Sequence, residues 1–180
     1  MNIFIVDECP VLSAAALPDR HVTEMGLETC QMISVIYSPW YHNWGTIPKK
    51  DGTPYKTEKG AFRNHPCTSW AAKSYENLAW LIRHGYALCN EYRHRYGKVH
   101  SCLDALSTAE DIFTQQTNED IGIYKNVKSF VRAMPDNFKL DNTISDVEAY
   151  QRYVASKPWA QHNYLRIPNR KPLWMSNYAG

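Results

Sequence analysis

The sequence lacks the features that mark a disulfide-stapled, zinc-binding or membrane-spanning protein. Its five cysteines form no CxxC pair and leave an odd one over, which argues against a disulfide framework and against a structural zinc site. No apolar run approaches the ~18 residues that a bilayer crossing needs. The opening stretch, MNIFIVDECP, has no positively charged start and too short an apolar run for an export signal. We therefore expect reduced thiols, a cytoplasmic location and no membrane partner.

The chain also has little net charge, and its aromatic residues are the more informative feature. A formal net charge of +2 over 180 residues is too small to indicate a nucleic-acid partner. Six Trp and twelve Tyr are many for this length, and such rings serve cores, interfaces or stacking on bases. The length suits one domain. We expect a helical domain over residues 1–157 and an aromatic, basic C-terminal tail over residues 158–180 packed on it.

Hydrophobic periodicity predicts a mainly α fold: a single compact helical domain with long loops. The clearest element is a helix over residues 19–37, where apolar residues recur at the spacing of one helical face. Asp19 is its expected N-cap, and Pro39 follows its end. Residues 2–6, NIFIV, are compatible with a buried strand or with an N-terminal segment packed into the core.

Several further helices are expected along the rest of the chain. One begins at Pro66 and continues to about residue 96, with a break or bend at His84-Gly85. Others are predicted over residues 11–17, 103–116, 123–134 before a stop at Pro135, and 146–156, where Ser145 and Glu148 form a capping box. Residues 40–63 instead form a long loop in which basic and aromatic residues alternate. A loop of that length is typical of a functional or mobile segment.

A polar stripe on the helix over residues 19–37 raises the first functional question. His21 and Glu28 are seven residues apart, which is two helical turns, so their side chains point the same way. Glu24 lies between them on the same stripe. The stripe is compatible with a solvated helix face that carries a local ion pair or with the floor of an active site.

Two motifs in this order and spacing resemble the pyrimidine-dimer DNA glycosylase family, the phage-type endonuclease V group. The first is L-P-D-R-H, residues 17–21, followed seven residues after the His by Glu28. The second is F-R-N-H-P, residues 62–66, which opens a later helix that runs on to R-H-G-Y, residues 83–86. The tail WAQHNYLRIPNRKPLW looks like the family's aromatic and basic C-terminal stretch. The resemblance covers about the first hundred residues and implies an all-α DNA glycosylase, with or without AP-lyase activity, from a phage or a bacterium.

The resemblance also implies roles for individual residues. Glu28 corresponds to the family's essential glutamate, a carboxylate that stabilises the positive charge developing on the sugar as the base leaves. The family uses the α-amino group of a small residue at position 2. Here position 2 is Asn, which keeps the initiator in place, so the free amine belongs to Met1. His21 is a candidate for a phosphate contact or proton transfer, and Glu24 for acid or base chemistry.

The second motif and the long loop supply candidates for holding DNA. Basic and aromatic side chains there suit phosphate contacts and stacking in an opened base pair. The predicted substrate-binding residues are Trp40, Trp44, Lys49, Lys50, Arg63, Asn64 and His65. For His65, a helix-capping or core role is the alternative. For the loop over residues 40–63, the alternative is an ordinary surface loop whose aromatic side chains pack against the protein.

No cofactor and no metal are expected. A metal site from His21, Glu28 and His65 has suitable donors, but no HExxH or paired-Asp signature supports it. Two other functions stay open beside the DNA glycosylase. One is an enzyme that modifies a base or nucleotide on the same fold, and the other is a non-enzymatic module that binds nucleic acid or protein. The sequence does not give the oligomeric state.

Overall fold

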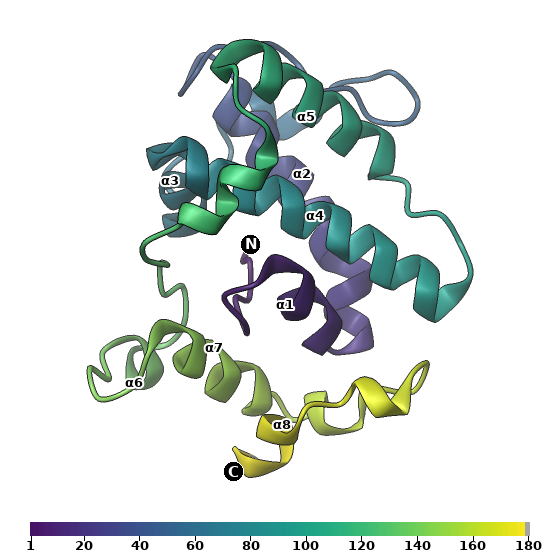
Figure 1. The fold of residues 1–180 in the computed structure, drawn as a ribbon, viewed down its shortest axis with the longest axis vertical. Helices are drawn as coiled ribbons and strands as arrows, with labels where there is room; N and C mark the ends of the chain where they lie inside the picture. Colours follow the sequence, from purple (N-terminus) through teal and green to yellow (C-terminus); the bar gives the residue numbers. More distant parts are fainter. Residues whose placement is uncertain (179–180) are drawn as a thin grey trace.

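The computed structural model describes residues 1–178, and the regular structure there is helical, as predicted (Figure 1). One group of helices packs into the larger part of the molecule: α1 (Pro10–Ala16), α2 (Asp19–Tyr37), α3 (Pro66–Lys73), α4 (Tyr75–Tyr96) and α5 (Leu103–Thr117). A second group lies beneath it: α6 (Asp136–Lys139), α7 (Asp146–Ala155) and α8 (Leu173–Asn177). Short 3-10 turns η1 (Lys56–Lys59), η2 (Ile121–Asn126), η3 (Ala160–His162) and η4 (Pro168–Arg170) lie in the connections. In the part of the chain so described, the only β-pairing is an isolated bridge between Pro48 and Pro54.

Helices α2 and α4 form the centre of the larger part, and two details of α4 differ from the prediction. The chain breaks at Ser74, which ends α3 and caps α4 by accepting a hydrogen bond from the backbone N–H of Asn77 (3.1 Å). The pair His84-Gly85 neither breaks nor ends α4. A Cβ on Gly85 would lie 2.7 Å from Leu106 and 3.0 Å from Thr29. The glycine therefore lets α2 and α5 approach α4 closely, and this packing outweighs its poor helix propensity.

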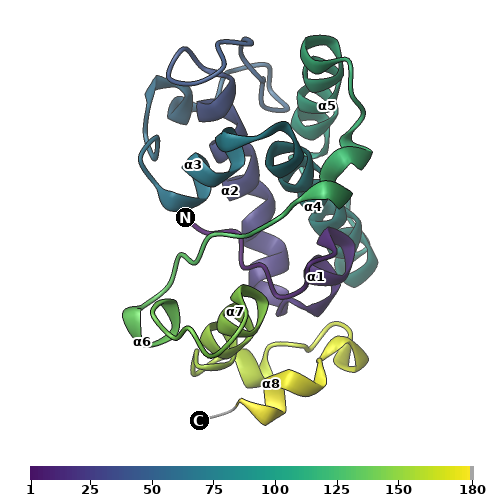
Figure 2. The same ribbon diagram turned by 60° about the vertical axis from the view of Figure 1, so that its left-hand side comes forward.

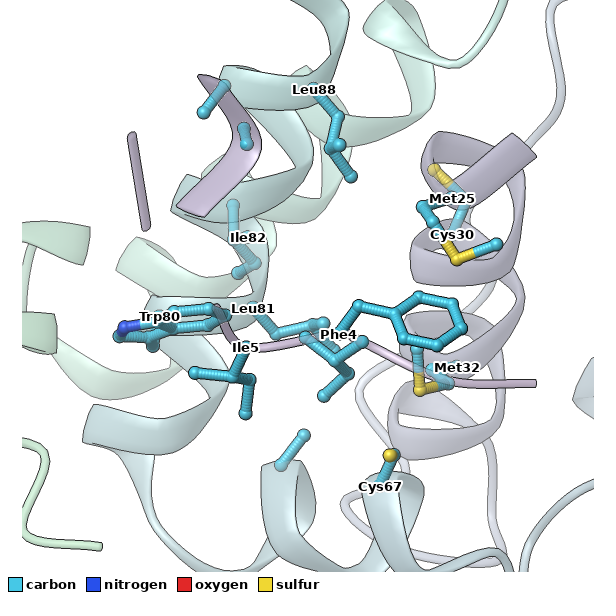
Figure 3. Packing of buried hydrophobic residues seen from close by; sticks show 14 of the residues in the cluster. Phe4, Ile5, Met25, Cys30, Met32, Cys67, Trp80, Leu81, Ile82 and Leu88 are labelled. Carbon is cyan, nitrogen blue, oxygen red and sulfur yellow. The ribbon is translucent and has the colours of Figure 1, made fainter. Parts of the chain in front are cut away.

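The N-terminal segment Asn2–Val6 passes between α2 and α4 without forming a strand (Figure 3). The second of the two alternatives for NIFIV is therefore confirmed. Since no neighbouring strand pairs with this buried backbone, side chains satisfy it instead. Asn2 Oδ1 accepts hydrogen bonds from the N–H groups of Ile3 (2.7 Å) and Phe4 (3.0 Å), and Ser13 Oγ accepts one from Val6 (3.1 Å).

Asp19 has a different role from the N-cap that was predicted, because the cap position belongs to Pro18. The Asp19 carboxylate instead accepts hydrogen bonds from the backbone N–H groups of Leu165 (2.8 Å) and Arg166 (3.1 Å) in the tail. Its other oxygen pairs with the buried guanidinium of Arg95 (3.1 Å). The carboxylate therefore joins α2, α4 and the tail rather than closing its own helix.

The segment before α7 also departs from the prediction. The expected helix over residues 123–134 is confined to the short turn η2, and residues 127–133 run as irregular chain beside the core. Pro135 stands at the N-cap of α6, so it begins a helix instead of ending one. A proline suits that boundary because its fixed φ is compatible with helix entry and it lacks only an N–H that would be unpaired there.

Helix α7 begins as predicted, but only half of the capping box forms. Ser145 Oγ accepts a hydrogen bond from the backbone N–H of Glu148 (3.1 Å). The Glu148 carboxylate turns away and binds Arg152 (2.8 Å). The five cysteines are free thiols, and all but Cys9 are buried. Within residues 1–178, no helix combines the length and apolar character that crossing a membrane requires.

We expect Arg95→Ala to lower the free energy of unfolding by about 3–5 kcal/mol, the cost typical of breaking a buried ion pair. The reason is that Arg95 also binds Glu91 (3.0 Å) and the carbonyl oxygens of Leu17 (2.7 Å) and Ala15 (2.9 Å). Urea unfolding measures the change. The exposed pair of Arg20 and Glu24 provides the control, since Arg20→Ala should cost less than about 1 kcal/mol. Equal losses in both variants would contradict this role for Arg95.

Candidate active site

The α-amino group of Met1 lies beside the carboxylate of Glu28. The amine nitrogen is 3.7 Å from Glu28 Oε2, and the backbone N–H of Asn2 donates a hydrogen bond to the same oxygen (2.8 Å). The Glu28 side chain is 26% exposed, so solvent or a substrate can reach the carboxylate. Two predicted catalytic groups, 27 positions apart in the sequence, are thus in one place.

Asn2 holds the amine in this position, a role that the sequence analysis did not assign. Besides its Oδ1 contacts to Ile3 and Phe4, its Nδ2 donates to the carbonyl of Ala133 (2.7 Å). Phe4, the end of this tight turn, adopts a left-handed φ of 55°. Asn readily hydrogen-bonds to the backbone two residues on, and this propensity is the signal that could have identified it.

His21 lines the same pocket as Met1 and is a buried, uncharged ring. It is 3% exposed, stacks on Phe4 with ring centroids 4.0 Å apart, and meets the edge of Trp159 at 5.1 Å. Burial lowers the pKa of His21 to about 3, with smaller contributions from the nearby charges of Lys157 and Arg20. Its Nδ1 atom has no hydrogen-bond partner. A neutral imidazole of this kind can accept a hydrogen bond but offers no positive charge to a phosphate.

A pocket of about 290 Å³ adjoins these residues and brings α2, the N-terminus and the tail together. Lys157, just after α7, forms part of its wall. The Lys157 ammonium lies over the rings of Tyr153 (4.7 Å), Phe4 (5.1 Å) and Trp159 (5.9 Å). Burial lowers the pKa of Lys157, and the neighbouring charge of Arg20 adds to that effect. The pocket therefore combines carboxylates, cations and aromatic faces.

Two more pockets continue along the exposed face of α2. The first, about 530 Å³, shares Glu24 and Glu28 with the pocket just described and reaches His100. The second, about 210 Å³, shares Leu27 and Gln31 with the first and reaches Lys49 and Lys56. We call this row of three pockets the α2 trough. Cations stand at both of its ends: Arg20 and Lys157 at one, Lys49 and Lys56 at the other.

Another pocket, about 570 Å³, lies elsewhere, between the 124–132 segment and the start of α7. It contains none of the predicted site residues, and its Arg132 is already bound to Asp146 (2.7 Å) and to backbone carbonyls. We therefore place the candidate active site at the α2 trough, where the ionisable groups converge.

His65 caps α3 and also lies beside the N-terminus. Its Nδ1 accepts a hydrogen bond from the backbone N–H of Cys67 (3.1 Å), which is the capping role considered as the alternative. Burial lowers the pKa of His65, and the positive charge of the Met1 amine lowers it further. Figure 2 shows the same proximity, with the start of α3 next to the N-terminus. Asn64, its neighbour in the motif, is exposed.

The remaining predicted DNA-binding residues lie in three places. Arg63 lies on the surface turn that leads to His65. Its guanidinium stacks over the half-exposed ring of Trp40, 4.1 Å from the ring centroid. Lys49 and Lys50 lie on the loop at the far end of the α2 trough. Trp44 packs on His42 (4.6 Å) and on Tyr37 (5.2 Å). Tyr37 is the last residue of α2 and lies about 14 Å along the helix axis from Glu28. The structure does not bring Trp44 to the trough, and its role in substrate binding stays a prediction.

Glu24 is exposed and forms an ion pair with Arg20 (3.3 Å). Its environment therefore differs from that of Glu28, one turn further along α2. Over residues 1–178, no group of three or more His, Cys, Asp or Glu side chains is arranged to hold a metal ion. The combination of His21, Glu28 and His65, considered above as an alternative, is not such a group.

Comparison with known families identifies the family to which the chain is similar. A family model described as pyrimidine dimer DNA glycosylase matches residues 1–104. The matched region contains Met1, all of α2, the motif around His65 and α4, which confirms the resemblance inferred from the two motifs. Comparisons with curated proteins and with solved structures gave no match.

The buried His21 predicts a loss of stability on mild acidification. The unfolded chain takes up a proton near pH 6.5, whereas the folded chain resists protonation until about pH 3, so stability falls as the pH decreases through this window. Between pH 6.5 and pH 5.5 the His21 contribution is about 1 kcal/mol. In urea unfolding at the two pH values, the His21→Phe variant should lose correspondingly less stability than the wild type. An identical pH dependence in both proteins would contradict the neutral, buried assignment.

Proposed function

The chain belongs to the pyrimidine dimer DNA glycosylase family, and on that premise we propose that it excises a damaged or modified pyrimidine from DNA and cleaves the resulting abasic site. The observation that carries the proposal is the 3.7 Å approach of the Met1 amine to Glu28 Oε2 at the edge of a pocket. A nucleophile and an acid–base group are then within reach of one sugar carbon.

The chemistry follows from these two groups. Glu28 takes a proton from the Met1 ammonium, and the freed lone pair of the nitrogen forms a bond to C1′ of the sugar. The bond between C1′ and the base breaks, and the base leaves with the bonding electrons and takes up a proton. Glu28 is ionised again once its proton has passed to the departing base, and its carboxylate then stabilises the positive charge on the sugar. Opening of the sugar ring gives an imine, from which loss of the 3′ phosphate by elimination cleaves the strand.

The α2 trough supports the DNA-binding half of the proposal. Its cationic ends suit two phosphate groups on either side of the reacting nucleotide, with Arg20 and Lys157 at one and Lys49 and Lys56 at the other. The carboxylates of Glu24 and Glu28 lie between these ends. They repel a phosphate and favour a sugar with developing positive charge there.

We expect Glu28→Gln to lower the rate of base release by about 100-fold or more, the range typical of losing a positioned acid–base group. Folding should be little affected because the Gln amide keeps an oxygen for the Asn2 N–H. Glu24→Gln is the matched comparison, with the same change one turn away on the same helix, and should lower the rate less because Glu24 is exposed and paired with Arg20. Single-turnover assays on duplexes containing a pyrimidine dimer measure both variants.

A Glu28→Gln variant as active as the wild type would discard this site. Tight, salt-dependent DNA binding without release of any base from the wild type would instead favour the non-enzymatic alternative. Release of a modified free nucleotide, detected by mass spectrometry, would favour the nucleotide-modifying alternative.

The amine half of the proposal has its own test. Borohydride reduction on abasic DNA should trap a covalent adduct, and peptide mapping should place it on the Met1 nitrogen. Adding one residue before Met1 moves the amine away from Glu28 and should abolish the adduct. Lys157 is the competing amine, since its ammonium lines the same pocket. An adduct mapped to Lys157, or one that survives the extension, would refute the role of Met1.

A further inference from the structure

Two thiols and an imidazole that the proposed mechanism does not use meet beside the α2 trough. Cys102, at the N-cap of α5, is in contact with α2, because Cys30 Sγ donates a hydrogen bond to its carbonyl oxygen (3.9 Å). The backbone N–H of Cys102 donates to Nδ1 of His100 (3.1 Å). The hydroxyl of Tyr55, at the start of η1, donates to the Cys102 sulfur (3.9 Å). Cys102 is therefore surrounded by hydrogen-bonding groups from separate parts of the chain.

His100 is held against α2 at a position that a glycine leaves open. A Cβ on Gly26 would lie 3.1 Å from Cε1 of the His100 ring, so the glycine provides the space that the imidazole occupies. Nε2 of His100 donates to the carbonyl oxygen of Thr23 (3.2 Å). Because that hydrogen bond holds the proton on Nε2, Nδ1 is the basic nitrogen, and it faces Cys102. The ring is thus placed to take the proton of the Cys102 thiol.

Cys102 differs from an ordinary buried thiol in its protonation. Burial by itself raises the pKa of a thiol, and it raises the pKa of Cys67 to about 12. At Cys102, hydrogen bonding with the Cys30 side chain is the larger effect and lowers the pKa. The His100 ring lowers the pKa of Cys102 further. The thiolate is the form of cysteine that attacks electrophiles, so these neighbours activate the sulfur.

A pocket gives small molecules a route to Cys102. Cys102 and His100 are in the wall of the pocket of about 530 Å³ in the α2 trough. Cys102 is 3% exposed, whereas Cys30 is 0% exposed, so a molecule in the pocket reaches Cys102 first. Glu24 and Glu28 line the same pocket, and their negative charges disfavour an anion there. The geometry therefore suits a small, neutral electrophile such as hydrogen peroxide.

We propose that Cys102 is a nucleophilic thiol that hydrogen peroxide oxidises, and that Cys30 resolves the oxidised residue as a disulfide. The Cys102 thiolate attacks one oxygen of the peroxide and the O–O bond breaks. The leaving hydroxide takes the proton held by His100, which gives a sulfenic acid and water. The Cys30 sulfur then attacks the Cys102 sulfur, and the sulfenic oxygen leaves as water with the Cys30 proton. Both thiols are oxidised, and the peroxide is reduced to water.

The bond joins two parts of the candidate site. Cys30 belongs to α2 and Cys102 to the start of α5, 72 positions further along the chain. Their pocket also contains Glu28, so the oxidised and reduced proteins differ in the wall of the α2 trough. A thiol reductant restores the reduced form, because disulfides exchange with free thiolates.

Peroxide treatment of the full-length chain tests the assignment. We expect stoichiometric hydrogen peroxide at neutral pH to lower the protein mass by the two thiol hydrogens, and peptide mapping without reductant should find a bond between Cys30 and Cys102. Dithiothreitol should reverse the change. In Cys30→Ser, dimedone should instead trap a sulfenic acid on Cys102. Cys89→Ser is the matched control, since Cys89 is another buried thiol beside His100, and it should form the bond as the wild type does.

Alkylation by iodoacetamide provides a second measurement that needs no oxidation. Its rate follows the thiolate fraction, so an ordinary thiol with a pKa of about 8.5 reacts about tenfold faster for each pH unit between pH 6 and pH 7.5. The rate at Cys102 should change less than about twofold over that range. His100→Asn should make the pH dependence at Cys102 steeper, because the thiolate loses its imidazolium partner.

Three results would overturn the proposal. The first is a peroxide-treated wild type that contains no bond between Cys30 and Cys102. The second is a bond from Cys102 to Cys89 in its place. The third is an alkylation rate at Cys102 that rises with pH as an ordinary thiol's does. None of these measurements depends on base release, so they are decided separately from the proposed function.

Discussion

The passage of the N-terminal segment between α2 and α4 is the constraint on which the candidate site depends. Residues 2–6 lie among apolar side chains of both helices (Figure 3), and their backbone is satisfied by Asn2 and Ser13 instead of a neighbouring strand. A chain end is normally free to fray. Here the burial of the residues that follow fixes the α-amino group beside Glu28. The same buried apolar contacts that stabilise the core therefore position the amine.

The tail contributes to the site through a second, separate set of contacts. Asp19 joins the start of α2 to the backbone of Leu165 and to Arg95. Because His21 is the next-but-one residue on α2, the same region that is tied to the tail carries the buried imidazole, and Trp159 closes over its edge. The pocket wall at Lys157 thus depends on the docking of residues beyond the 104 that match the family.

Much of the helical framework followed from local patterns. The bounds of α2 agree with the prediction because its apolar stripe is long and a proline stands at each end. Helix α5 and the start of α7 were also found, the latter through Ser145. The errors fall where tertiary packing competes with local propensity. Gly85 lies mid-helix because α2 and α5 need the space, and residues 127–133 are irregular because they pack against the core as an extended connection.

The sequence by itself determined the spacing of the candidate groups on α2, since seven residues of helix align His21 with Glu28 whatever surrounds them. It also determined that a helix begins at Pro66 after His65. Only the tertiary structure decided the environment of each group. Periodicity places His21 and Glu24 on one stripe, yet the first is buried against Phe4 and the second faces solvent with Arg20. The approach of Met1 to Glu28 likewise joins segments far apart in the chain, and local sequence patterns do not report such contacts.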